Sequence, residues 1–139
     1  MTMKQADLDL TKVMVLLQRR YNFIREIHKL TKELADALAR NDDVSTSMIL
    51  QMRAEEMGKA DDCKDELWRL GEHDRKAQEK LRLLILSEPQ EDAGEDLEEK
   101  KIFEIRRKTQ AMIDEIREID QRLSQKLAGE KSYYEKAAR

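Results

Sequence analysis

The side chains that could bind a metal ion are few and far apart in this sequence. The only histidines are His28 and His73, and neither has a second ligand at a spacing that places two ligands on one helix face. Glu26 lies two residues before His28 and Glu72 directly before His73, so the Glu-x-x-His pattern of di-iron bundles is absent. We therefore expect no metal site, and we predict that both histidines lie on solvated helix faces.

The sequence also offers little support for a catalytic nucleophile or a phosphate-binding site. Cys63 is the only cysteine, so the chain cannot form an internal disulfide. The carboxylates of Asp61 and Asp62 beside it disfavour the thiolate that a reactive cysteine needs. The sequence has no glycine-rich phosphate-binding loop. We predict that the protein is not an enzyme, with no catalytic residue and no cofactor.

Length and composition favour long helices in one domain. The chain has 139 residues, of which 41% are charged and only 4% are aromatic, with a single proline. The net charge of −3 argues against a nucleic-acid partner, which would require a basic surface. The first ten residues lack the apolar stretch of a signal peptide, and no apolar run approaches the roughly 20 residues that span a bilayer. We expect a cytoplasmic protein that does not insert into membranes.

Apolar residues recur at alternating steps of three and four, which predicts helices that pack like coiled coils. We predict an all-α fold in a single domain, 1–139, built as an antiparallel up-down-up bundle of three long helices. The predicted helices cover about 5–40, 44–86 and 95–128. Asp42 or Asp43 should cap the second helix, and Gly129 should end the third, leaving a tail at 129–139. The seam of the third helix consists of Ile102, Ile105, Thr109, Met112, Ile116, Ile119, Leu123 and Leu127.

The middle helix has an uneven pattern that leaves alternatives open. The stretch "HDRKAQEK" at 73–80 is polar on nearly every side, which indicates a segment that opens easily. The cluster "LRLLIL" at 81–86 is either buried by both neighbouring helices or forms a patch for a dimer or client. Met48, Met52, Met57 and Met112 either fill the core or supply flexible side chains to a groove.

Two stretches carry a resemblance to a known family. The first is "LLQRRYNFIREIHKLTKELADALARNDDVSTSMILQMRAEEM" at 16–57, and the second is "EIREIDQRLSQKLAGEKSYY" at 115–134. The first resembles the helical hairpin of the FlgN and FliT group of flagellar export chaperones, and the second is similar to the last helix and tail of FlgN-like proteins. The resemblance implies a cytoplasmic chaperone that holds hook-associated or filament-cap subunits before type III export.

The same resemblance implies where a client would bind. In FlgN-like chaperones the C-terminal region contacts the client, and here that region comprises Ile116, Ile119, Leu123, Leu127, Tyr133 and Tyr134. The two tyrosines have a second interpretation from the residues alone: one of them folds back and caps the bundle end with its ring.

Two other functions remain open at the level of sequence. One is a structural coiled-coil adaptor or homodimer without chaperone activity. The other is an enzyme: "MIDEIREIDQRLSQKLAGEKSY" at 112–133 resembles the opening helix of all-helical chorismate mutases. That helix begins the domain in the mutases, whereas here it lies near the end of the chain.

Overall fold

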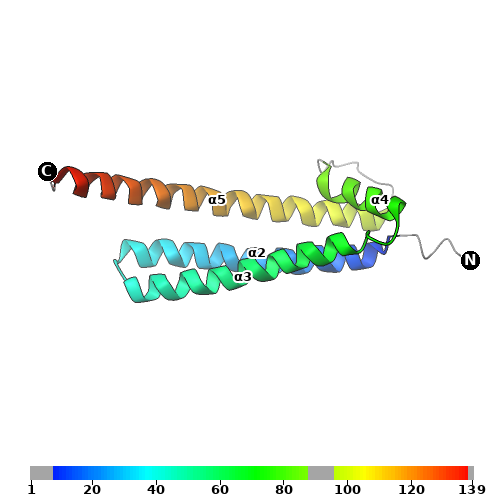
Figure 1. The fold of residues 1–139 in the computed structure, drawn as a ribbon, viewed down its shortest axis with the longest axis horizontal. Coiled ribbons are helices and arrows are strands. Elements are labelled where there is room, and N and C mark those ends of the chain that lie inside the picture. Colours follow the sequence, from blue (N-terminus) through cyan, green and yellow to red (C-terminus); the bar gives the residue numbers. More distant parts are fainter. Residues whose placement is uncertain (1–7, 88–95, 138–139) are drawn as a thin grey trace, which may run out of the picture.

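The structure, a computed structural model, describes residues 8–87 and 96–137, with side chains as far as residue 127. These residues form four helices: α2 (Leu10–Ala39), α3 (Asp43–Arg69), α4 (Arg75–Leu86) and α5 (Leu97–Ala137). Figure 1 shows α3 running back along α2 as a long hairpin, while α5 lies beside this hairpin and runs in the direction of α2. The prediction of an all-α protein is confirmed.

The α2–α3 hairpin is closed by a short turn with well-formed caps. Asn41 adopts a positive φ of 56°, a conformation that asparagine tolerates better than most residues. Asp42 is the N-cap of α3: its Oδ1 accepts a hydrogen bond from the Ser45 amide at 3.0 Å, and its Oδ2 accepts one from the Ser45 hydroxyl at 2.6 Å. The start of α2 is capped in the same way by Asp9, so this helix begins at Leu10 rather than near residue 5.

The predicted helix at 44–86 is wrong in its second half, because the structure divides it into α3 and α4. The division falls at Gly71, where the chain turns so tightly that a Cβ atom would lie 2.9 Å from the Cα of Gln78. Asp74 then caps α4 by accepting a hydrogen bond from the Ala77 amide at 3.1 Å. The polar stretch at 73–80 is therefore a helix start, and a start favours polar capping residues.

The predicted end of the third helix at residue 128 is also wrong. Helix α5 continues through Gly129 to Ala137, so the backbone of 129–137 is helical and does not form a separate tail. A single glycine costs a helix only about 1 kcal/mol relative to alanine, and the residues around it are good helix formers. In Figure 1 the red C-terminal end of α5 extends beyond the α2–α3 turn.

The buried residues form two clusters along the molecule. The larger lies where α4 packs near the open end of the hairpin, and it consists of Leu8, Val13, Leu16, Leu17, Leu67, Ala77, Leu81, Leu84, Ile102 and Phe103. The smaller lies midway along the hairpin and consists of Ile24, Ile27, Ala60 and Ile116. Thr31 and Thr109 are polar but buried, and each hydroxyl donates a hydrogen bond to the carbonyl four residues earlier.

One part of the apolar cluster at 81–86 is buried and another part is exposed, so the buried-core and the exposed-patch interpretations each apply to some of its residues. Leu81 and Leu84 are buried, whereas Leu83 and Leu86 are 68% and 64% exposed. This division follows from the helical period, which allows α4 to bury only one side against its neighbours. Within the part of the chain that the structure describes, we find no helix that is long and apolar enough to cross a membrane.

Candidate partner-binding surface

Two charged contacts hold the middle of α5 against the hairpin. Both terminal nitrogens of Arg53 on α3 donate hydrogen bonds to the two carboxylate oxygens of Asp120, the first at 2.9 Å. On the α2 side, His28 Nε2 lies 2.9 Å from a carboxylate oxygen of Glu115. The prediction that His28 lies on a solvated face is therefore wrong, because its side chain is only 13% exposed.

The apolar stripe of α5 becomes more exposed toward its C-terminal end. Ile116 is buried in the smaller core cluster, Ile119 and Leu123 are half-buried, and Leu127 is 48% exposed. These residues were predicted to bind a partner, and they do share one side of the helix. The structure shows that only the later members of the stripe have apolar surface available to another molecule.

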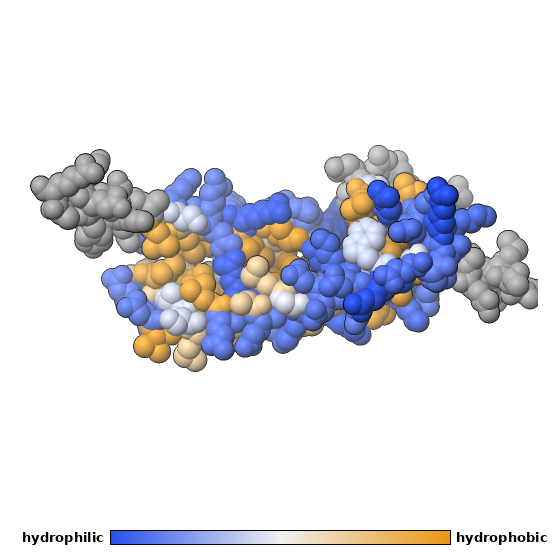
Figure 2. Space-filling model, in the orientation of Figure 1, coloured by the Kyte–Doolittle hydropathy of each residue, from blue (hydrophilic) through white to orange (hydrophobic). Residues whose placement is uncertain are grey.

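Exposed apolar side chains of α3 lie on the same side of that helix as Arg53, which reaches Asp120 on α5. Leu50 and Met57 are three residues before and four after Arg53, so all three share one side of α3. Leu50 and Met57 are each nearly half exposed. We define the hairpin-end surface as Leu50, Met57, Ile119, Leu123 and Leu127. Figure 2 shows hydrophobic side chains gathered on the hairpin and on α5 at this end of the molecule.

The methionines of α3 do not fill the core, which corrects the core-filling alternative for them. Met48 is 60% exposed, Met52 is 46% exposed and Met57 is 47% exposed. Met48 and Met52 lie one turn apart on a different side of α3 from Arg53, so they are separate from the hairpin-end surface. The fourth methionine of that prediction, Met112 on α5, does contribute to the core, since it packs against the smaller core cluster.

The two tyrosines lie at positions where the structure describes only the backbone. Tyr133 and Tyr134 belong to the last turns of α5, and their side chains lie outside the described part. Both interpretations of these rings, the cap and the partner contact, therefore stay predictions.

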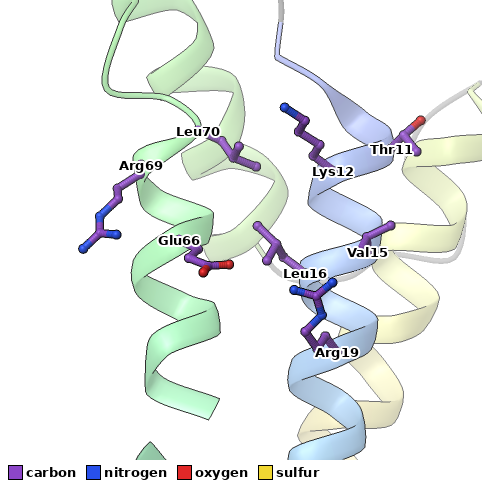
Figure 3. Close-up of a pocket in the computed structure, with 8 residues that line it drawn as sticks. All are labelled: Thr11, Lys12, Val15, Leu16, Arg19, Glu66, Arg69 and Leu70. Atoms are coloured by element: carbon purple, nitrogen blue, oxygen red, sulfur yellow. The ribbon is translucent and has the colours of Figure 1, made fainter. Parts of the chain in front are cut away.

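A second apolar surface lies between α2 and α3, nearer the open end of the hairpin. Figure 3 shows Leu16, Glu66 and Leu70 pointing into the space between the two helices, with Arg69 pointing away. The groove has a volume of about 420 Å³, and Val15, Lys12 and Arg19 complete most of its wall. It is an open surface groove with three basic side chains and one acidic side chain on its border.

Cys63 and His73 are the remaining side chains that the sequence singled out for possible chemistry. Cys63 is buried, and this burial is the main cause that raises the pKa of its thiol, although Arg19 nearby acts in the opposite direction. His73 is exposed near the α3–α4 corner. Within residues 8–87 and 96–137, no group of three or more His, Cys, Asp or Glu side chains is arranged to hold a metal ion.

The sequence interpretation missed the Arg53–Asp120 contact. Arg53 and Asp120 are 67 residues apart, and each looks like one more charge on a polar helix face. Only the relative register of α3 and α5 brings them together. Comparison of the chain with models of protein families, with curated proteins and with solved structures finds no match.

Proposed function

We propose that this protein is a flagellar type III export chaperone that binds an amphipathic helix of a hook-associated or filament-cap subunit on the hairpin-end surface. The observation that carries the proposal is that apolar side chains of both α3 and α5 are exposed near the hairpin turn. Leu50 on α3 is 49% exposed and Leu127 on α5 is 48% exposed. A helix with its own apolar stripe could cover these side chains, as in other helix-in-groove complexes.

The arrangement of the long helices supports the same role. In this proposal α2, α3 and α5 act as an up-down-up bundle in which α5 packs mainly on α2, with Ile102, Phe103 and Ile116 buried and Leu127 exposed. The second half of α5 and the end of the hairpin then remain available to a client helix. Burying each large apolar side chain contributes about 1.5 to 3 kcal/mol, so a few such residues suffice for a reversible complex.

The proposal is tested by titrating the full chain with a peptide that contains the C-terminal helix of a hook-associated subunit from the same genome. We expect saturable binding by isothermal titration calorimetry. A peptide of the same composition with its apolar positions scrambled should not bind, because it cannot present a continuous stripe. Equal binding of both peptides, or of neither, would contradict the proposal.

Two further measurements separate the alternatives. Deleting residues 130–139 should weaken client binding if the last turns of α5 take part in it. Light scattering on the free chain then distinguishes a chaperone from a structural dimer. A stable dimer that dissociates only when Leu127 is replaced by Asp would assign the hairpin-end surface to self-association instead.

A further inference from the structure

A cavity lies between all four helices, at the opposite end of the molecule from the hairpin-end surface. Its volume is about 370 Å³, which falls within the usual range of small-molecule sites. The apolar wall comes from Leu17, Leu67, Trp68, Ile85, Leu86 and Ile113. Four separate helices therefore contribute to one concave site, and Ser87, Thr109 and Gln110 add polar groups to its lining.

The charged side chains that line this cavity are all positive. They are Arg20 on α2, Lys64 on α3 and Arg106 on α5, and no described lining residue is acidic. Arg106 has a structural role: its terminal nitrogens donate hydrogen bonds to the carbonyl oxygens of Leu84 and Ser87, which fixes the end of α4. Its charge nevertheless adds to the positive potential of the cavity.

Arg20 is the side chain that points most clearly to a ligand. It lies three residues after Leu17 and four before Ile24, in the apolar stripe of α2 where an apolar residue would normally stand, and burial lowers the pKa of its guanidinium. Asp61 favours the charged form from a distance, but no hydrogen bond or ion pair joins Arg20 to any residue that the structure describes. A partly desolvated guanidinium with unused donors is well suited to bind a carboxylate.

We propose that this cavity binds a small organic carboxylate with an apolar body, whose carboxylate is held by Arg20 and Lys64 and whose body packs against Trp68 and the leucines. The size of the cavity limits the ligand to a short aliphatic chain or a single ring system. The site is separate from the hairpin-end surface and does not depend on the chaperone role.

The single tryptophan of the chain provides a direct test, since Trp68 lines the cavity. Octanoate serves as the probe and 1-octanol as its uncharged counterpart, because neither absorbs where tryptophan is excited. We expect octanoate to change the Trp68 fluorescence saturably, with a dissociation constant on the order of 1 mM or tighter. The alcohol should bind roughly tenfold more weakly, because it cannot form charge-assisted hydrogen bonds.

Matched variants assign the effect to the cavity. Arg20→Gln should weaken octanoate binding by roughly tenfold or more, whereas Arg19→Gln removes the same charge from the exposed neighbour and should leave it unchanged. Lys64→Gln, at an exposed position, tests the site without disturbing the core should Arg20→Gln fail to fold. Absence of saturable binding, equal affinity for the alcohol, or equal loss in the Arg20 and Arg19 variants would overturn the proposal.

Discussion

Arg53 joins α3 to α5 through its contact with Asp120. Its side chain is 15% exposed, that of Asp120 is 36% exposed, and the Nε atom of Arg53 is buried without a hydrogen-bond partner among the described residues. Both charges have thus lost part of their hydration, and each compensates the other. Removal of one leaves the other partly buried and unpaired.

We therefore expect Arg53→Gln to lower the free energy of unfolding by about 1 to 2 kcal/mol. Arg122→Gln breaks the exposed Arg122–Glu118 pair on α5 and should change stability by less than about 0.5 kcal/mol. Urea unfolding followed by circular dichroism measures both variants. Equal effects would mean that the Arg53–Asp120 pair does not hold α5 to the hairpin.

Asp42 makes the stability of the hairpin depend on pH. The hydrogen bonds from Ser45 lower the pKa of its carboxyl below the ordinary value of 3.8. A carboxyl with a lowered pKa in the folded state contributes stability above its unfolded pKa, and this contribution is lost as the pH falls through the folded pKa.

Asp42→Asn keeps an acceptor at the N-cap but removes this titration. We expect the wild type to be more stable than the variant at about pH 7, and the difference to narrow as the pH falls toward about 3. Urea unfolding of both proteins across this range measures the difference. A constant difference at every pH would show that the Asp42 carboxylate is not stabilised in the folded state.

Among the elements, the α3–α4 corner is the feature that the sequence pattern concealed. Apolar residues return at Leu81 and Leu84 after the polar stretch at 73–80, so the sequence was interpreted as one helix with a soft segment. The break depends on Gly71, whose close approach to Gln78 exists only once α4 has folded back. In contrast, the α2–α3 turn was predictable, because Asp42 is a local capping signal that requires no distant contact.

Two glycines of the same region provide a matched pair of substitutions. Gly71→Ala should destabilise the protein by about 1 to 3 kcal/mol, because the new Cβ would meet the backbone of Gln78 at 2.9 Å. Gly58→Ala should stabilise it by about 0.5 to 1 kcal/mol, since Gly58 lies inside α3 with nothing within 4 Å of the added atom. Thermal melting compares them, and a shift of the same sign in both would contradict the close approach at Gly71.

Burial along α5 also shows how far sequence can predict a site. The heptad pattern placed Ile116, Ile119, Leu123 and Leu127 on one side of a helix, which the structure reproduces. The pattern could not show that Ile116 belongs to the core while Leu127 remains exposed, because burial depends on where α5 packs against the hairpin. The end of α5 was missed for the opposite reason: Gly129 is a strong local signal that the surrounding helix formers overcome.

At the scale of the whole molecule, the two ends differ in how completely their apolar side chains are buried. The end with α4 contains the larger core cluster, where side chains from all four helices pack together. The other end has the hairpin turn, exposed apolar residues on α3 and α5, and a length of α5 that extends beyond the turn (Figure 1). One end thus contains the larger part of the core, and the other provides the surface that we propose for a client helix.

The most direct test of this account is the affinity of the full chain for the C-terminal helix of a hook-associated subunit, compared between Leu127→Asp and Gln125→Asp. Both substitutions add one negative charge to exposed positions of α5, but only Leu127 belongs to the hairpin-end surface. We expect Leu127→Asp to weaken binding by roughly tenfold or more while the melting temperature stays nearly unchanged, and Gln125→Asp to bind like the wild type. Equal affinities in the two variants would contradict the proposal that the hairpin-end surface holds the client.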